Sequence, residues 1–230
     1  MRKAIEMGID KEGFCSVIME GRGIPAKGAF PSSFTYGNDA VETVSYDPEE
    51  AKKLLEESGW TDTDGDGYVD KDGQKLTINW LTYPTRLEQP KLAEYAQATL
   101  KEIGIDVSVN NTSDHRTYAE NGEFDVYVSS LTTAPTGDPE YFFSSTVTGS
   151  KNYGNYQNDE VTKLTEQLHQ TFDTDERGKL AVELQQKILD DDAYFFVSHL
   201  NMGIVTKANV TGMAAHPCDY YEITADLDVQ

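Results

Sequence analysis

Cysteine and histidine are both scarce in this sequence. The two cysteines, Cys15 and Cys218, lie near opposite ends of 230 residues and belong to no CxxC motif or cluster with zinc spacing. They are either one disulfide or two free thiols, and we favour free thiols because nothing in the sequence brings them together. No two of the four histidines are spaced three or four residues apart; they are His115, His169, His199 and His216. We expect no transition-metal cage made by this chain alone.

Long apolar runs and basic charge are also missing. No stretch of about 18 apolar residues occurs, so we expect no segment that spans a bilayer. Only 19 basic residues stand against 40 acidic ones, a formal net charge of -21. Such a field repels a phosphate backbone, which argues against nucleic acid as a partner, and a solvated acidic surface is the simplest interpretation. The opening residues Met1 to Ile5 lack the apolar centre of a signal peptide, so we expect any export signal of the parent protein to lie upstream.

The motifs of common enzyme classes are absent as well. The sequence contains no G-x-S-x-G, H-E-x-x-H, P-loop or G-x-G-x-x-G pattern. We therefore predict that the chain is not an enzyme and requires no cofactor. A hydrophobic share of 38% with nine Phe and 13 Tyr is typical of a globular chain that can bury a core.

Helix signals open and close most of the expected elements. Residues 1–19 predict two short helices broken at residues 8–10, and residues 24–43 predict a loop. Asp47 suits an N-cap and Glu50 completes a capping box, with the helix ending at Gly59. Further helices are expected over residues 88–103, after a Ser113 cap to residue 121, over 158–172 and over 175–189.

Alternating apolar residues predict strands between these helices. Residues 76–80, 105–109 and 124–130 are expected as strands, with a closing pair at 195–197 and 204–206. The β-α-β-α-β order favours an α/β fold with a mainly parallel sheet and helices on both faces.

Two loops carry the candidate ligand-binding residues. The first, residues 131–141, leaves the carboxyl end of the third predicted strand, where open α/β sheets place their ligands. Asp138 followed by Pro139 is equally consistent with a helix cap. The second loop, residues 149–158, concentrates amides and phenols with one cation, a combination that suits small polar ligands. The candidates from both loops are Thr132, Thr133, Thr136, Asp138, Lys151, Asn152, Tyr153 and Tyr156.

An acidic segment between the first long helix and the first strand resembles part of a calcium loop. Asp62, Asp64, Asp66 and Asp70 occupy positions 1, 3, 5 and 9 of the pattern. Position 12 is Gly73 rather than the bidentate glutamate of a complete EF-hand. A structural calcium site and a simple turn both remain open.

Several motifs in order resemble the dipeptide-, oligopeptide- and nickel-binding family of solute-binding proteins. They are residues 2–10, Ile24-Pro25-Ala26, residues 46–60 with the acidic loop that follows, residues 100–105 and Gly137-Asp138-Pro139. The resemblance covers almost the whole chain. It implies the C-terminal lobe of a bilobed protein, with a type II periplasmic-binding-protein-like fold.

The resemblance also implies where this lobe works. Residues 1–209 would be the ligand-binding lobe, and residues 210–230 would return toward an N-terminal lobe that this chain lacks. The whole protein would lie outside the cytoplasm, in the periplasm or lipid-anchored at the outer face of the membrane. It would hand its solute to the permease of an ABC importer.

One departure from the family pattern bears on the ligand. In peptide-binding members the loop after the third strand carries an aromatic residue and then an aspartate that pairs with the peptide's amino group. Leu131 and Thr132 stand near the aromatic position here, and Pro135 stands at the aspartate position. The resemblance therefore favours nickel or a small metal chelate. A peptide receptor and a peptide-sensing interaction domain are the alternatives.

Overall fold

The computed structural model describes residues 1–215 and 223–230. The helices are α1 (Arg2–Met7), α2 (Lys11–Gly13), α3 (Pro48–Glu57), α4 (Glu88–Glu102), α5 (His115–Glu120), α6 (Glu140–Phe142), α7 (Asp159–Gln170) and α8 (Thr174–Asp190). Short π-helical turns extend α2 (η1, Phe14–Ile18) and α6 (η3, Phe143–Val147), and η2 (Asn38–Ala40) is a 3₁₀ turn. The strands are β1 (Gly23–Pro25), β2 (Asp70–Lys71), β3 (Gln74–Lys75), β4 (Thr77–Thr82), β5 (Asp106–Asn111), β6 (Val126–Tyr127), β7 (Ser198–Leu200), β8 (Val210–Thr211) and β9 (Asp228–Val229). None of the helices described is both long and apolar enough to cross a membrane.

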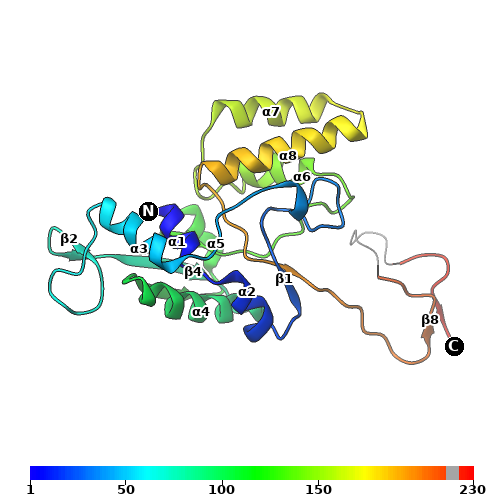
Figure 1. Cartoon of the computed structure of the whole chain (residues 1–230). Helices are drawn as coiled ribbons and strands as arrows, with labels where there is room; N and C mark the ends of the chain where they lie inside the picture. Colours follow the sequence, from blue (N-terminus) through cyan, green and yellow to red (C-terminus); the bar gives the residue numbers. More distant parts are fainter. Residues whose placement is uncertain (216–222) are drawn as a thin grey trace.

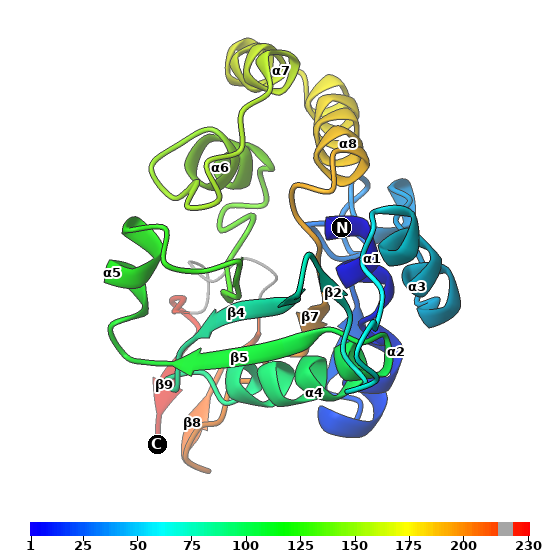
Figure 2. The ribbon, with the colours of Figure 1, turned by 90° about the vertical axis from the view of Figure 1, so that its left-hand side faces the viewer.

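A parallel sheet in the order β5-β4-β6 organises the lower half of the molecule as drawn in Figure 2. Trp80 of β4 lies opposite Val109 on one side and Val126 on the other. Helix α4 connects β4 to β5 and packs beneath them, and α5 connects β5 to β6 on the upper side (Figure 2). The predicted β-α-β-α-β order is therefore confirmed. Three carboxyl strand ends meet at one edge of the sheet as a result.

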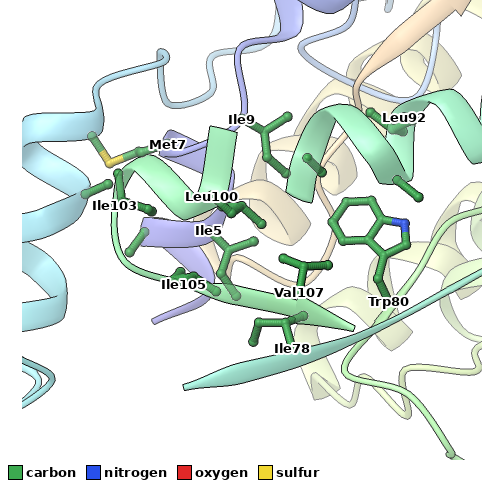
Figure 3. Close-up of a cluster of buried hydrophobic side chains, with 14 of the residues drawn as sticks. Ile5, Met7, Ile9, Ile78, Trp80, Leu92, Leu100, Ile103, Ile105 and Val107 are labelled. Atoms are coloured by element: carbon green, nitrogen blue, oxygen red, sulfur yellow. The ribbon is translucent and has the colours of Figure 1, made fainter. Parts of the chain in front are cut away.

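The larger hydrophobic core lies between this sheet and the helices that cover it. Ile78 and Trp80 are two positions apart in β4 and therefore point to the same face of the sheet, where they belong to one cluster with Leu92 and Leu100 of α4 (Figure 3). Helix α1 adds Ile5 to the same cluster. The Trp80 side chain has no exposed surface. Burial of side chains of this size contributes about 2 kcal/mol each, so this layer fixes the sheet against its helices.

A second core joins α6, α7 and α8 to the loop that precedes α3. Phe30 is fully buried there and makes edge contacts with Tyr36 at 5.0 Å and with Phe142 and Phe143 at 5.9 Å between ring centroids. Leu184 of α8 completes the cluster. In Figure 1 this helical layer stands above the sheet and carries the long loops that follow β6.

The predicted Asp47 cap is confirmed, and the predicted Ser113 cap is wrong. Asp47 accepts a hydrogen bond from the Glu50 N–H at 3.0 Å. The structure adds caps at Asn158 and Asp173, which begin α7 and α8 in the same way. Ser113 does not cap α5, because the N-cap position of this helix is occupied by Asp114. The third strand is also shorter than expected, since only Val126 and Tyr127 pair with β4.

The predicted pairing of residues 195–197 with residues 204–206 is wrong, because the strand that forms here pairs with a segment far away in the sequence. Residues 23–25, expected as loop, form β1 and pair antiparallel with residues 198–200. No strand forms at residues 204–206 in the described structure, and Val205 is 97% exposed. Cys15 is buried, and its pairing with Cys218 lies outside the described residues.

Gly104 joins α4 to β5 in a conformation that other residues avoid. Its φ is +80°, and a Cβ atom would lie 2.9 Å from Val69 Cγ1. Its carbonyl accepts a hydrogen bond from the Val69 N–H at 2.7 Å. We expect Gly104→Ala to lower the free energy of unfolding by about 1–3 kcal/mol, measured by urea denaturation of this chain.

Gly178→Ala is the matched control for this substitution. Gly178 lies inside α8, and the nearest atom to an added Cβ is 3.8 Å away. We expect the free energy of unfolding to stay unchanged or to rise by up to about 1 kcal/mol. Equal destabilisation by the two substitutions would contradict the account of Gly104.

Candidate functional site

The carboxyl edge of the parallel sheet gathers aromatic and imidazole side chains from three connections. Tyr83 follows β4 directly, His115 opens α5 after β5, and Tyr127 ends β6. Since parallel strands present their carboxyl ends on the same side, these residues meet although they are far apart in sequence. Tyr153, from the second predicted ligand loop, joins them by contact with Tyr127. We call these four residues the strand-end cluster.

Ring geometry in the strand-end cluster is well defined. The His115 ring stacks on Tyr83 with centroids 4.1 Å apart, and its Nδ1 shares a hydrogen bond of 2.7 Å with Tyr127 Oη. Tyr153 meets Tyr127 edge to face at 5.7 Å. The Tyr83 hydroxyl accepts a hydrogen bond from the Ser130 N–H, which ties the cluster to the chain entering the first ligand loop. Aromatic faces held in this way suit a planar or chelated solute.

Burial favours the uncharged form of two cluster residues, His115 and Tyr127. It lowers the pKa of His115, with a smaller effect from the nearby positive charge of Arg116. It raises the pKa of Tyr127 to about 12. A neutral imidazole keeps a lone pair that a metal or a hydrogen-bond donor can use.

The first predicted ligand loop, residues 131–141, is fixed to the helical core. Thr133 donates its hydroxyl hydrogen to the Ala29 carbonyl at 2.9 Å, and Tyr36 donates to the Gly137 carbonyl at 2.7 Å. Ala134 and Pro135 are buried, whereas Thr132 and Thr136 are exposed. The loop therefore presents two threonines to solvent, and Thr133 supports it from behind.

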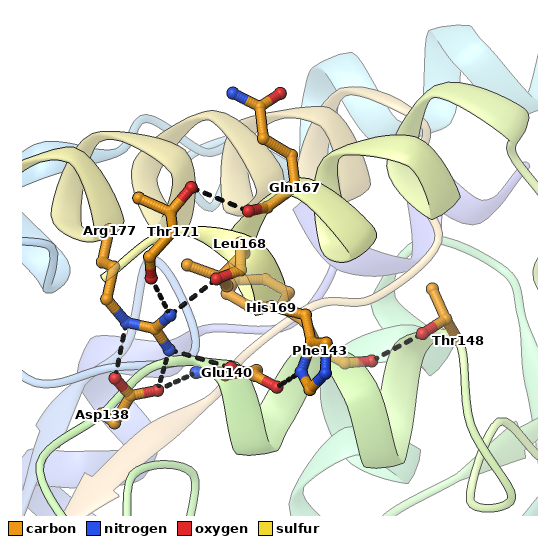
Figure 4. Close-up of polar contacts among 9 residues, drawn as sticks. All are labelled: Asp138, Glu140, Phe143, Thr148, Gln167, Leu168, His169, Thr171 and Arg177. Carbon is orange, nitrogen blue, oxygen red and sulfur yellow. Dashed lines mark hydrogen bonds and ion pairs between the residues drawn. The ribbon is translucent and has the colours of Figure 1, made fainter. Parts of the chain in front are cut away.

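Asp138 belongs to an ion-pair network with α8 (Figure 4). Its two carboxylate oxygens accept hydrogen bonds from Arg177 Nε at 2.8 Å and Nη2 at 2.6 Å. Glu140 takes a further bond from Nη2 at 2.9 Å, and its other oxygen meets His169 Nδ1 at 2.6 Å. Partial burial acts to raise the pKa of Asp138, but the bonds from Arg177 and the Glu140 N–H outweigh it and lower that pKa. Asp138 also accepts a hydrogen bond from the Glu140 N–H, but the N-cap position of α6 is Pro139, one residue later than predicted.

The second predicted ligand loop, residues 149–158, splits into structural and accessible parts. The Asn152 side-chain amide donates to the Tyr156 carbonyl and accepts a hydrogen bond from the Tyr156 N–H. The Tyr156 hydroxyl donates to Asp191 at the end of α8. Exposed Lys151 lies 3.0 Å from the Tyr141 hydroxyl. Tyr153 alone reaches the strand-end cluster through a ring contact.

The acidic loop lies at the opposite edge of the sheet. Its Val69 bonds to Gly104 and Leu76, just before β5 and β4 begin. Carboxylate oxygens of Asp62, Asp64 and Asp70 lie within 4.8 Å of one another. The Asp62 carboxylate accepts the N–H groups of Gly65 and Gly67, and Asp70 bonds to Thr63. Asp66 caps the Tyr68 N–H instead. Calcium binding stays a prediction here, at a place remote from the strand-end cluster.

Sequence reasoning missed three of the four cluster residues. His115 was considered only as an isolated histidine, and Tyr83 and Tyr127 were not singled out. A usable signal existed, because each of these residues follows or lies within a predicted strand of one parallel sheet. Asp138, Asn152 and Tyr156 are held by contacts within the chain, and their predicted contact with ligand stays a prediction.

Known structures share this fold over the full chain. NikA of Staphylococcus aureus in complex with Ni(L-His)2 matches with a TM-score of 0.80 at 24% identity, covering 100% of this chain and 48% of that one. AppA of Bacillus subtilis in complex with a nonapeptide matches with a TM-score of 0.78 at 29% identity, covering 96% and 45%. The chain has the type II periplasmic-binding-protein-like fold that was predicted.

Sequence comparisons give the family. The model for bacterial extracellular solute-binding proteins, family 5 Middle, matches residues 1–154. The oligopeptide-binding protein AppA of Bacillus subtilis is 32% identical over 97% of this chain and 42% of its own length. The nickel-binding periplasmic protein of Escherichia coli is 27% identical over 94% and 43%. The chain belongs to family 5 of the bacterial solute-binding proteins, and it spans less than half the length of these relatives. They are binding proteins rather than enzymes, in agreement with the prediction.

The ion pair at Asp138 predicts an acid-dependent stability. Because its pKa is lowered on folding, the pair stabilises the fold above the unfolded pKa near 4 and loses this contribution as pH falls through the folded pKa. We expect Asp138→Asn to cost about 1–2 kcal/mol of unfolding free energy at pH 7. The difference from wild type should shrink when urea denaturation is repeated at pH 3.

Asp72→Asn provides the control, since Asp72 is an exposed carboxylate in the turn between β2 and β3. Its stability difference from wild type should be small at both pH values. A constant deficit for Asp138→Asn between pH 7 and pH 3 would show that charge on Asp138 does not matter.

Proposed function

We propose that this chain is the C-terminal lobe of an extracytoplasmic receptor that captures a small metal chelate, with nickel as the metal, for an ABC importer. The observation that carries this proposal is the charge of the loop at residues 131–141. Its carboxylates, Asp138 and Glu140, are both bound by Arg177. Pro135, at the position where the peptide-binding pattern has an aspartate, supplies no charge for a peptide's amino group.

The strand-end cluster supplies the chemistry for a chelate. The half-buried ring of Tyr153 offers a flat surface on which a chelator can lie, and buried Tyr83 supports the His115 ring by stacking on it. His115 has one ring nitrogen bonded to Tyr127, and its Nε2 makes no hydrogen bond with the residues described. In the tautomer in which Nδ1 donates its hydrogen to Tyr127, Nε2 carries the lone pair that can bind the metal or a polar group of the chelator, which supplies the remaining metal ligands. Lys151 can meet a carboxylate of the chelator.

Closure over the ligand would require a second lobe. We propose that residues 1–209 form the ligand-binding lobe and that residues 210–230 return toward an N-terminal lobe. Met202 and Val205 are 74% and 97% exposed just before that segment, which is costly for apolar side chains without a partner. A permease of the importer would then receive the solute from the closed pair of lobes.

A peptide is the second candidate ligand. The 32% identity to an oligopeptide-binding protein favours it, since this exceeds the identity to the nickel-binding relative named above. A peptide would have to find a charge partner for its amino group outside residues 131–141 of this chain.

Native mass spectrometry of the two-lobed protein as purified separates these candidates. A bound mass with a nickel isotope pattern would support the chelate. A ladder of peptide masses, or no binding of added Ni(L-His)2 by calorimetry, would overturn it.

Tyr153→Ala in the two-lobed protein should weaken binding of Ni(L-His)2 about tenfold, because the chelate loses a stacking face. Thr133→Val should weaken it less, since Thr133 acts by holding the loop to Ala29. Tyr68→Ala, in the acidic loop at the opposite edge, should leave the affinity within about twofold of wild type. Unchanged affinity in both Tyr153→Ala and Thr133→Val would refute this site.

A further inference from the structure

We infer that Arg177 is the positioning residue of the loop at residues 131–141, and that it sets the charge preference of this loop by neutralising both of its carboxylates. The inference deepens the proposed function and rests on it, because it takes this loop to face the solute.

All five N–H donors of the guanidinium are used. Besides the three bonds to Asp138 and Glu140, Nη1 donates to the carbonyls of Leu168 and Thr171, both at 2.6 Å. These carbonyls lie at the end of α7, where backbone acceptors have few partners within the helix, and the Leu168 carbonyl also accepts the Thr171 N–H at 3.3 Å. Arg177 therefore links three segments at once, and it cannot turn away without breaking several bonds (Figure 4).

The network has a buried side and an accessible side. The Arg177 side chain is only 14% exposed, whereas that of Asp138 is 40% exposed. A solute that approaches the loop thus meets a carboxylate whose charge is already balanced from behind. Attachments at Thr133 and Gly137 also hold the loop, but both are neutral hydrogen bonds. Among the residues that the structure describes, Arg177 is the cation that pairs with both carboxylates.

Loss of Arg177 would leave two carboxylates without this charge. Glu140 would keep its contact with His169, and Asp138 would keep the bond from the Glu140 N–H. The loop would then attract cationic groups, among them the amino group of a peptide. A lysine would restore a point charge without the planar fork that holds both oxygens of Asp138.

The test compares Arg177→Gln with the triple variant Arg177→Gln/Asp138→Asn/Glu140→Gln in the two-lobed protein. The probes are Ni(L-His)2, trialanine and N-acetyl-trialanine. In Arg177→Gln the preference for trialanine over its acetylated form should rise about tenfold. The triple variant should return this preference to near the wild-type value, because the uncompensated charges are gone. A role in packing alone predicts no such rescue.

Lys179→Gln is the matched control, since it removes one positive charge from an exposed site on α8. It should leave the preference unchanged. An unchanged preference in Arg177→Gln, or the same change in Lys179→Gln, would overturn the charge role.

Two readouts remain decisive if the proposed function fails and wild type binds none of the probes. Hydrogen exchange of residues 131–141 should accelerate in Arg177→Gln and not in Lys179→Gln. The pKa of Asp138, followed by carboxyl carbon resonances, should rise in Arg177→Gln toward the ordinary aspartate value. If neither changes, Arg177 does not position the loop, whatever the ligand is.

Discussion

Parallel pairing of β4 with β5 and β6 is the constraint on which the rest of the structure depends. Each connection runs back through a helix to the amino edge, so that every strand ends at the same carboxyl edge, where Tyr83, His115 and Tyr127 converge. The buried layer around Trp80 holds this arrangement from one side. Because the cluster comes from three separate connections, its geometry depends on the sheet and not on any one loop.

Charge is distributed unevenly over this strongly acidic chain. The strand-end cluster contains no carboxylate, lysine or arginine, and the carboxylates of the neighbouring loop are balanced by Arg177. The aspartates of the acidic loop collect instead beside the amino ends of β4 and β5. A solute would therefore meet a locally balanced surface although the chain carries a net charge of -21.

Local signals in the sequence were enough for the elements but not for their distant contacts. The Asp47 cap and the alternation around Trp80 predicted helix and strand positions, because caps and periodicity act within a few residues. The pairing of Gly23 with Leu200 depends on residues far apart and was missed. For the same reason Asp138 was predicted as a ligand residue or a cap, while its partner Arg177, 39 positions away, was not considered. The loops were located correctly, but the division between their supporting and accessible side chains required the structure.

The central claim is that solute binds at the carboxyl edge of the sheet. Anomalous X-ray diffraction at the nickel edge, from crystals of the two-lobed protein grown with Ni(L-His)2, tests it most directly. The account predicts an anomalous peak beside His115 and Tyr153. A peak only at the acidic loop, or no peak in crystals with fully closed lobes, would contradict it.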